Sequence, residues 1–467
     1  MPLDELREEC GVFGVYAPGV DVARTTYFGL YALQHRGQES AGIASADGSE
    51  IKIHTRMGLV NTAFSEENLA SLTGHIAIGH TRYSTTGSSD PRNAGPMVAR
   101  SHFGTVAVSH NGNLVNSDIL RREMQESGVD FVTSTDSEVL TWRIALNFGP
   151  DIVSRIKQAM SRFIGAYSLA VLLPNALVGV RDPHGIRPLC LGKIDGGWVI
   201  ASETCAFQTV GASFERELEP GEIVVIDEDG VHSYPPEDTR KRQAMCIFET
   251  IYFARPDSFM MGDRLHLTRQ RMGAELYREY PVDADIVIPL PDSAVPAAIG
   301  FARESGIPYA EGLIKNRYIG RTFIQPDQRL REQGVQLKFN ALPEVLEGKR
   351  VALIDDTIVR GTTSKPIVDL LRNNGATEVH MRVHAPPIKW PCYLGVDMAK
   401  RSELIAANLS IEEIGERIGA DSIGYLSLEG LERAINAGEN RFCTGCLTGQ
   451  YPVPVQMEMD KLSLERV

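Results

Sequence analysis

Two adjacent carboxylates followed by a loop of small and hydroxyl residues form the segment of this chain best suited to chemistry. The run Val351–Ile354 is short and apolar, as in a buried parallel strand, and Asp355 and Asp356 follow it. The loop Thr357–Ser364 then leads to a helix that we expect to start near Pro366. A helix N-terminus favours a phosphate, and paired acids suit ribose hydroxyls or Mg²⁺. The segment predicts a site for a phosphorylated ribose, although an ordinary surface turn would show the same pattern.

A second strand of this half is expected to end beside the two acids. Asp285–Leu290 is an apolar run that stops shortly before Ser293. Because ligands bind at the carboxyl ends of strands in α/β sheets, Ser293 is predicted to face the same cleft as Asp355 and Asp356. The intervening segment Lys315–Asn340 is basic, Gln-rich and weakly periodic. It is predicted to be a mobile loop, either an ordinary surface loop or a lid that closes over the ligand.

The strand, the acids and the Gly/Thr loop together resemble the binding loop of type I phosphoribosyltransferases. The resemblance implies that the acids bind the ribose hydroxyls of phosphoribosylpyrophosphate (PRPP) and that the loop holds its 5-phosphate. It also implies that Ser293, Asp355 and Asp356 line a Mg²⁺ site. Carried over position by position, the PRPP-binding residues are Asp355, Asp356, Thr357, Arg360, Gly361, Thr362 and Thr363.

The first half of the chain contains a cysteine and several polar segments interrupted by glycine. Cys10 opens an alternating run typical of a strand, where a cysteine is by itself an ordinary core residue. Each polar segment alone is typical of a turn or a helix cap, and Asn-Gly is a turn signal. The segments are Gln34–Ile43, Gly79–Thr85, His110–Asn113 and Ser134–Glu138.

In this order, these segments resemble the glutaminase domain of class II, or N-terminal-nucleophile (Ntn), amidotransferases. The resemblance implies that Cys10 is the nucleophile and that Asn111 and the backbone N–H of Gly112 form the oxyanion hole. It also implies that Arg82 binds the α-carboxylate of glutamine and Asp136 its α-ammonium group. Hydrolysis of a carboxamide requires such a nucleophile, a base and an anion-stabilising pair. An N-terminal cysteine can use its own α-amine as the base.

That mechanism requires a free amine on Cys10, but nine residues precede it. We therefore predict that residues 1–9 are a propeptide removed during maturation. The alternative is that Cys10 is internal and inert. Cys190 and Cys205 are expected to be core residues.

The four remaining cysteines are Cys246, Cys392, Cys443 and Cys446. The last two form a CxxC pair, which suits zinc, iron–sulfur and redox chemistry alike. Four thiolates complete either a zinc site or a [4Fe–4S] cluster, and composition does not choose between them. The chain resembles the branch of glutamine PRPP amidotransferases that has both a cleaved leader and a four-cysteine [4Fe–4S] cluster. The resemblance implies a structural cluster.

The chain has 467 residues, which is too long for one ordinary core. The charged, Pro-containing stretch Tyr234–Arg242 is the expected boundary between residues 10–235 and 236–467. The resemblance implies an Ntn-hydrolase αββα sandwich for the first part. In the second, apolar strands alternate with helical patterns, which predicts a parallel sheet covered by helices. The expected fold is thus a two-domain combination of α+β and α/β classes.

The composition is ordinary for a globular protein, with a formal net charge of −13. This charge argues against broad nucleic-acid or anionic-membrane surfaces. No apolar run approaches the ~20 residues of a membrane helix. Residues 1–10 are acidic and polar, unlike a targeting peptide. We therefore predict a cytoplasmic protein.

Taken over the chain from Cys10 to about Gln450, the resemblance is to the glutamine PRPP amidotransferases. It implies that ammonia from glutamine passes internally to PRPP, giving 5-phosphoribosylamine, glutamate and pyrophosphate in the first step of purine synthesis. It also implies inhibition by purine nucleotides and a homotetramer. One alternative is another class II amidotransferase, such as glucosamine-6-phosphate synthase. The other is a PRPP-binding iron–sulfur sensor without turnover.

Overall fold

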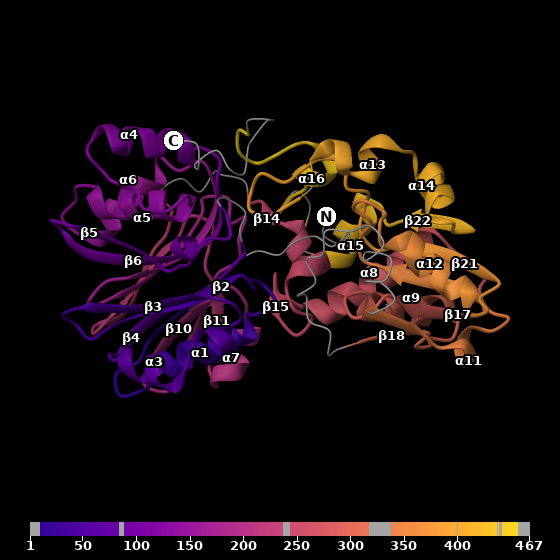
Figure 1. Ribbon diagram of the computed structural model, residues 1–467, viewed down its shortest axis with the longest axis horizontal. Helices are drawn as coiled ribbons and strands as arrows, with labels where there is room; N and C mark the ends of the chain where they lie inside the picture. The colour runs from indigo at the N-terminus through magenta and orange to yellow at the C-terminus, as the bar shows by residue number, and fades with distance from the viewer. Residues whose placement is uncertain are drawn as a thin grey trace.

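The computed structural model describes residues 10–83, 88–236, 243–316, 338–398, 400–436, 438 and 441–455. The predicted propeptide lies outside the described residues, as do residues 317–337 of the predicted loop. Two bodies lie side by side, the first half of the chain in one and the second half in the other (Figure 1). Among the described residues, no helix has the length and apolar character needed to cross a membrane.

The first half contains two antiparallel sheets. One has seven strands in the order β11-β9-β10-β1-β4-β2-β3, and the other has six in the order β13-β12-β8-β7-β6-β5. The strands of the first sheet are β1 (Gly11–Tyr16), β2 (Ser40–Ala46), β3 (Ile51–Met57), β4 (Ile76–Arg82), β9 (Cys190–Ile194), β10 (Gly197–Ala201) and β11 (Ser213–Glu217). Those of the second are β5 (Met97–Ser101), β6 (Gly104–Leu114), β7 (Gly165–Leu172), β8 (Leu177–Arg181), β12 (Ile223–Asp227) and β13 (Gly230–Tyr234).

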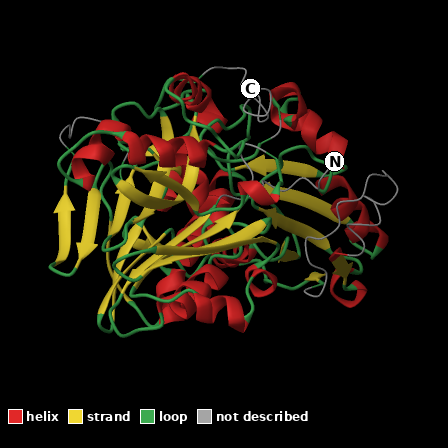
Figure 2. Ribbon diagram, turned by 60° about the vertical axis from the view of Figure 1, so that its left-hand side comes forward, coloured by secondary structure: helices red, strands yellow, loops and turns green. Residues whose placement is uncertain are grey.

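Helices cover the outer face of each sheet. Those against the first sheet are α1 (Val22–Ala32), α2 (Val60–Ala63), α3 (Glu66–Ser71) and α7 (Cys205–Val210). Those against the second are α4 (Ser117–Glu126), α5 (Asp136–Leu146) and α6 (Ile152–Met160). The inner faces share a core that includes Val12, Ile78 and Ala107. Figure 2 shows the sheets as inner layers with helices outside, the expected αββα sandwich.

The second half is built on a four-stranded parallel sheet in the order β17-β20-β21-β22. Its strands are β17 (Ile286–Pro289), β20 (Arg350–Asp355), β21 (Glu378–Val383) and β22 (Ser422–Tyr425). One face packs on α8 (Leu265–Glu279), α9 (Val295–Ser305) and α15 (Leu428–Ile435). The other packs on α12 (Ser364–Asn373) and α14 (Ile411–Ile418). The apolar runs are thus buried on both faces, as a parallel sheet requires.

Short elements complete the described part of the chain. They are a 3-10 turn η1 (Pro91–Asn93), β14 (Met245–Cys246), a π-helix η2 (Glu249–Phe253), β15 (Phe259–Met260), β16 (Asp263–Arg264), β18 (Leu313–Lys315), β19 (Phe339–Ala341), α11 (Pro343–Leu346), η3 (Arg401–Glu403), α13 (Ile405–Asn408), β23 (Phe442–Cys443) and α16 (Gly445–Thr448). β14 and β23 pair in parallel, so the start and the end of the second half meet.

Most of the sequence-based elements agree with the structure, with three differences. The strand before the acids is β20, and the helix expected near Pro366 is α12. The ends of the predicted loop Lys315–Asn340 are strands, because Lys315 of β18 pairs with Phe339 of β19 and Ile314 with Asn340. The start of the polar segment Gly79–Thr85 continues β4 as far as Arg82. The Asn111-Gly112 pair does not form a turn. Both residues continue β6, paired with Ser168 and Tyr167 of β7. Burial in a long central strand has overridden the local turn preference.

Candidate active sites

A narrow pocket lies where β1, β4, β6 and the start of α5 meet. It contains four of the five predicted glutaminase residues, and Asn111 adjoins it in β6. The lining residues are Cys10, His80, Arg82, Tyr83, His110, Gly112, Thr135, Asp136 and Ser137. Residues from three of the four polar segments singled out in the sequence are therefore gathered around Cys10, and the segment Gln34–Ile43 contributes none to the lining.

Cys10 is buried just before the start of β1. Its Sγ lies 3.4 Å from the carbonyl oxygen of Tyr83, to which the thiol donates. Burial raises the pKa of the Cys10 thiol to about 11, against the opposing effect of the Arg82 charge. A thiol with such a pKa is almost entirely protonated at neutral pH. Nucleophilic attack by Cys10 therefore needs a base.

Asn111, which adjoins this pocket, has an amide without a partner, as do single ring nitrogens of the lining residues His80 and His110. Its side chain is fully buried, and neither Oδ1 nor Nδ2 has a hydrogen-bond partner among the described residues. An unsatisfied buried amide is costly, so its presence favours a role in binding a ligand atom. Gly112 has φ +143°, and a Cβ there would stand 2.0 Å from the carbonyl oxygen of Ala166. Only glycine fits at this position.

Two opposite charges flank the thiol. Arg82 ends β4, and its NH1 lies 3.4 Å from Glu39 Oε2. Asp136 begins α5, and its Oδ2 accepts the Leu114 N–H at 2.9 Å. Both charges act on the Cys10 thiol, Arg82 lowering and Asp136 raising its pKa. A guanidinium and a carboxylate on either side of a nucleophile suit the two charged ends of an amino acid.

Two buried histidines support the pocket, and the sequence analysis gave them no role. His80 Nε2 donates to the carbonyl oxygen of His110 at 2.9 Å. His110 Nδ1 lies 3.0 Å from Ser137 Oγ. Burial lowers the pKa of His80 to about 3 and also lowers the pKa of His110. Both rings are therefore neutral supports at physiological pH.

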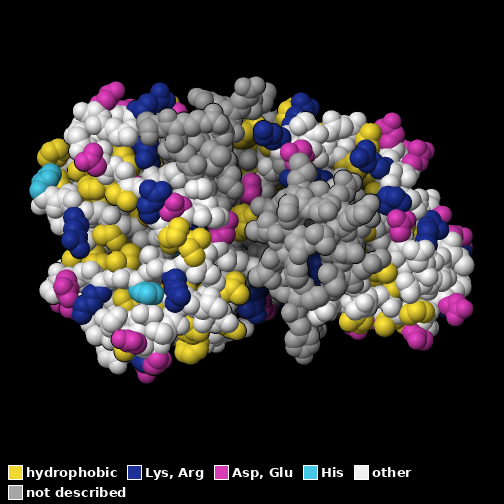
Figure 3. Space-filling model, viewed as in Figure 1, with side chains coloured by type: hydrophobic (Ala, Val, Ile, Leu, Met, Phe, Trp, Pro, Cys, Tyr) yellow, Lys and Arg dark blue, Asp and Glu magenta, His cyan; other side chains and the backbone are white. Residues whose placement is uncertain are grey.

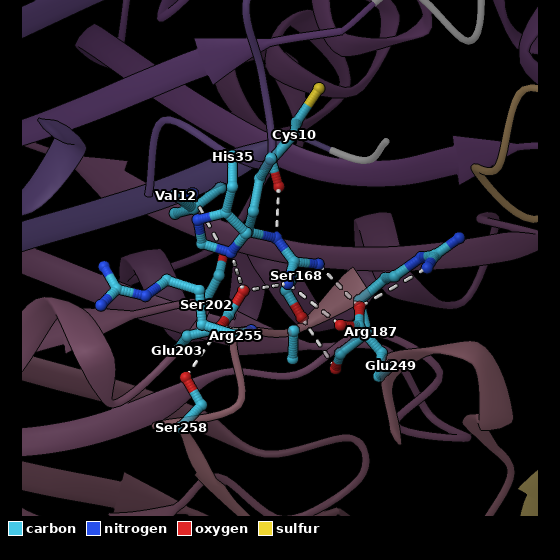
Figure 4. A network of polar contacts seen from close by, with 12 residues as sticks. Cys10, Val12, His35, Ser168, Arg187, Ser202, Glu203, Glu249, Arg255 and Ser258 are labelled. Atoms are coloured by element: carbon cyan, nitrogen blue, oxygen red, sulfur yellow. Dashed lines mark hydrogen bonds and ion pairs between the residues drawn. The ribbon is translucent and has the colours of Figure 1, made fainter. Parts of the chain in front are cut away.

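A buried ion network joins the backbone of Cys10 to the second half of the chain (Figure 4). Arg36 Nε donates to the Cys10 carbonyl at 3.3 Å. The same guanidinium donates to Glu203 Oε1 at 2.6 Å and to Glu249 Oε1 at 2.7 Å. Glu249 begins the π-helix of the second half, and Arg187 NH1 lies 3.7 Å from it. In Figure 4 the Cys10 carbonyl faces this network while the sulfur points away.

Glu203 is the other centre of this network. Its carboxylate accepts from His35 and Arg36 of the first half and from the Arg255 N–H and Ser258 Oγ of the second, at 2.6 to 2.9 Å. Although burial acts to raise it, the His35 and Arg36 charges hold the pKa of Glu203 well below its usual value. Arg36 lies in the polar segment Gln34–Ile43 but had no predicted role, and no sequence motif singled out Arg187 or Glu203. No local signal marks their partners, which are distant in sequence and come from both halves.

The predicted PRPP site lies at the carboxyl end of β20. Asp355 Oδ1 accepts the Asp356 N–H at 2.8 Å, and both carboxylates are nearly buried. Asp356 accepts from the Thr357 hydroxyl at 2.7 Å, and the Ser293 hydroxyl donates to its other oxygen. The structure thus brings Ser293 to the two acids, as predicted from the strand ends.

The loop after the acids is partly exposed. Gly361 has φ +72°, which favours glycine, and Thr362 is exposed. Arg360 Nε donates to Glu403 Oε2 at 3.0 Å. Thr363 directly precedes α12, so the loop ends at a helix N-terminus, as the phosphate prediction requires.

The four cysteines of the second half come together. Cys246 and Cys443 are paired residues of β14 and β23, and Cys446 is the second residue of the short helix α16 that follows. Cys392 Sγ accepts the N–H of Leu394 at 3.3 Å. Burial raises the pKa of Cys246 to about 11 and raises those of Cys443 and Cys446 further, and the neighbouring thiols add to each of these shifts. All four belong to or pack on one apolar cluster.

These thiols are near one another without closing on a single point. In the described part of the chain, no group of three or more His, Cys, Asp or Glu side chains is arranged to hold one metal ion. The ligands of a single zinc ion share one centre, whereas those of a [4Fe–4S] cluster bind different iron atoms and stand farther apart. The four thiols, two of them buried and two partly exposed, provide the kind of donor that either group requires.

Comparison with known proteins gives matches in both halves. The family profile described as a glutamine amidotransferase domain matches residues 80–209, and the phosphoribosyl transferase domain profile matches residues 268–389. The amidophosphoribosyltransferase of Synechocystis sp. is 51% identical over 99% of this chain and 95% of its own length. That of Methanocaldococcus jannaschii is 50% identical over 96% and 98%.

Two solved structures are similar along almost the whole chain. One is described as the allosteric regulatory enzyme of purine biosynthesis, with a TM-score of 0.91, 44% identity, and coverage of 97% of this chain and 98% of that one. The other is the glutamine PRPP amidotransferase of B. subtilis complexed with ADP and GMP, with the same TM-score and identity and coverage of 97% and 99%.

Fold, pocket and loop define a class II glutaminase joined to a phosphoribosyltransferase. Given the identities and coverage, the chain belongs to the amidophosphoribosyltransferase family. It is therefore an enzyme that uses glutamine and PRPP to form 5-phosphoribosylamine, glutamate and pyrophosphate in purine biosynthesis. Both alternatives, another class II amidotransferase and a sensor without turnover, are set aside.

Proposed function

We propose that the glutamine half-reaction takes place at Cys10 after residues 1–9 have been removed. The new α-amine takes the proton from Sγ as the sulfur attacks the glutamine carboxamide. Asn111 Nδ2 and the Gly112 N–H stabilise the oxyanion, and the proton passes to the leaving nitrogen as ammonia departs. Water then hydrolyses the thioester to glutamate. Arg82 and Asp136 hold the α-carboxylate and the α-ammonium group.

The observation that carries this proposal is the unpartnered Asn111 amide beside a buried thiol. The pKa of about 11 for that thiol explains the need for a base, and the new α-amine would lie on the same residue. Removal of the leader is then a chemical requirement.

In the second half, we propose that ammonia attacks C1 of PRPP and that pyrophosphate leaves. Asp355 and Asp356 would bind the ribose hydroxyls, with the 5-phosphate on Thr357, Arg360, Gly361, Thr362 and Thr363. Ser293, Asp355 and Asp356 offer the hard oxygen donors that suit Mg²⁺. When bound, Mg²⁺ neutralises charge on the departing pyrophosphate. Ammonia would travel inside the protein, because bulk water would protonate or dilute it.

The test is glutamate release by the mature protein with and without Mg-PRPP, with pyrophosphate counted in parallel. We expect strong stimulation by PRPP and one pyrophosphate for each glutamate. Glutamate release that ignores PRPP and yields no pyrophosphate would contradict the proposed coupling.

Leader removal is tested by mass spectrometry of protein purified from its natural host. We expect a mature chain that begins at Cys10. Active protein that still begins at Met1 or Pro2 would rule out the α-amine as base.

We further propose that Cys246, Cys392, Cys443 and Cys446 hold a structural [4Fe–4S] cluster. Their convergence from both ends of the second half supports this assignment, because a cluster there would tie together segments far apart in sequence. Anaerobically purified protein should contain about four iron atoms for each chain. Zinc in the absence of iron would overturn the assignment.

Purine nucleotides are proposed as inhibitors and a homotetramer as the assembly. The B. subtilis structure, described as a complex with ADP and GMP, supports nucleotide binding. On the face seen in Figure 3, acidic and basic side chains are interspersed and form no broad basic surface. Light scattering and inhibition by ADP and GMP test these proposals.

A further inference from the structure

A loop from the second half touches the predicted oxyanion hole of the first. Gly395 has φ +112°, and a Cβ on it would stand 3.0 Å from the carbonyl carbon of Gly112 and 3.1 Å from its Cα. The same Cβ would stand 2.8 Å from Arg187 NH2. The two glycines therefore approach backbone to backbone, with no room for a side chain between them.

Gly112 is confined from the other side as well. A Cβ on Gly112 would collide with the carbonyl oxygen of Ala166, which belongs to the neighbouring strand β7. β7 on one side and Gly395 on the other hold the backbone of Gly112 between them. The N–H of Gly112 is one of the two proposed oxyanion donors, so whatever fixes its backbone also fixes the direction of that donor.

The Gly395 loop is itself held by residues of the first half. Arg187, which is fully buried, donates from Nε to the carbonyl oxygen of Leu394 at 3.2 Å and from NH2 at 2.5 Å. Asn113 Nδ2 donates to the carbonyl oxygen of Tyr393 at 2.9 Å. Because Asn113 is next to Gly112 in β6, the loop is tied to the same strand that it supports. The contact is thus specific.

We propose that Gly395 is a positioning residue that completes the oxyanion hole of the glutaminase site from the second half of the chain. This inference rests on the proposed function of Asn111 and Gly112. An oxyanion donor acts only when it already points at the place where charge develops, and small displacements weaken it. Glutaminase chemistry then depends on the docking of the two halves as well as on its own residues.

The test compares two glycine-to-alanine variants with nearly equal backbone strain. Gly395→Ala places a methyl group against Gly112, whereas Gly104→Ala changes a glycine with φ +108° and no atom within 4 Å of the added Cβ. For Gly395→Ala we expect kcat for glutamine hydrolysis to fall roughly tenfold or more, with KM within about twofold. Pyrophosphate release with ammonia should match the unchanged protein, and Gly104→Ala should leave all three quantities unchanged.

A second variant guards against misfolding. Asn113→Ala removes the tie to Tyr393 without introducing backbone strain, and it should lower the same kcat in a smaller degree. Alkylation of Cys10 by an electrophilic glutamine analogue reports whether the nucleophile is still in place. An unchanged kcat for glutamine hydrolysis in Gly395→Ala would overturn the inference. So would an equal loss of glutamine hydrolysis and of ammonia-dependent pyrophosphate release in that variant.

A third variant separates this inference from the proposed function. Asn111→Ala removes the other proposed donor and should lower kcat by about 10²–10³. Normal kcat in Asn111→Ala would refute the oxyanion assignment itself. A large loss there together with normal kcat in Gly395→Ala would refute only the role of Gly395.

Discussion

The glutaminase pocket and the PRPP loop differ in how many parts of the chain build them. The pocket is buried, and its supports come from both halves through Arg36, Glu203, Glu249 and Gly395. The PRPP loop is built from two strand ends of one sheet, and its hydroxyl residues are partly exposed. A thioester mechanism needs fixed donors that exclude water, whereas a phosphate site must admit a large charged ligand. The difference predicts that damage to the second half reaches the pocket more readily than the reverse.

The strongest separation of the two sites comes from Cys10→Ala. Without the sulfur, glutamine-dependent formation of product should fall by at least about 10⁴-fold, as for other enzymes that lose their nucleophile. Turnover of PRPP with added ammonia should remain, because ammonia is the nucleophile at the second site and Cys10 is needed only to release it from glutamine. Product and pyrophosphate release with each nitrogen source give both rates. Cys190→Ala, in the same half and fully buried, is the control. Equal loss with ammonia would show that the sites are not separable.

Glu249→Gln tests how much the ion network between the halves contributes to the free energy of unfolding. The change leaves the buried Arg36 with one carboxylate partner, Glu203, in place of two. Breaking a buried ion pair costs about 3–5 kcal/mol, so urea unfolding should show a loss of this size. Glu123→Gln breaks a solvent-exposed pair with Arg162 inside the first half, and it should cost about 1 kcal/mol or less. Equal losses of unfolding free energy in the two variants would show that the network between the halves stabilises the protein no more than an exposed ion pair does.

The arrangement of the predicted PRPP loop could be anticipated from the sequence because its residues are local, and its ligand stays a prediction. Asp355, Asp356 and the Thr/Gly loop occupy nine consecutive positions, and strand-end geometry brought Ser293 to them. The predicted glutaminase residues are spread over 127 positions, from Cys10 to Asp136, and only their family resemblance identified them. The parallel sheet was predicted from the alternation of apolar strands and helical patterns, and the sandwich was predicted from the family resemblance.

The supports of the pocket were not predictable, for a physical reason. Arg36 and Glu249 are 213 positions apart, and a single charged residue in a polar segment resembles a surface residue. Gly395 carries no signal at all, because its importance depends on a backbone of the other half. The Asn-Gly pair gave a false turn signal, since strand pairing in β6 fixes its conformation. Local patterns specify elements, whereas contacts between halves appear only in three dimensions.

Asp356→Asn should impair the PRPP site and leave the glutaminase pocket active, the reverse of what is expected for Cys10→Ala. This change removes the negative charge that Ser293 and Thr357 contact, so kcat/KM for PRPP with ammonia should fall about 10–100-fold. Glutamate release in the absence of PRPP should not change, because Asp356 follows β20 of the second half and is not among the residues that line the glutaminase pocket. Asp369→Asn, on the exposed face of α12, is the control. A loss of PRPP-independent glutamate release would mean that the pocket depends on this acid as well.

The smallest expected effect is a change in how the free energy of unfolding depends on pH, which tests whether His80 in the glutaminase pocket is buried. The pKa of His80 is about 3 in the folded protein and about 6.5 when unfolded, so the unfolded chain binds a proton that the folded chain excludes. His80 therefore makes its full contribution to stability above pH 6.5, and stability falls as the pH drops from there toward 3. The slope is roughly 1.4 kcal/mol for each pH unit.

His80→Gln should remove this part of the slope, as measured by urea unfolding at pH 7 and pH 5. His232→Gln, at an exposed position on β13, should leave the slope unchanged. The charges of His110 and Arg82 disfavour the charged form of the His80 ring, whereas its hydrogen bond to the His110 carbonyl favours that form without outweighing burial. Neither provides a negative charge that would hold a proton on the ring as the pH falls. An unchanged dependence of the unfolding free energy on pH in His80→Gln would therefore mean that water reaches the His80 ring. The glutaminase pocket would then not differ in burial from the partly exposed PRPP loop.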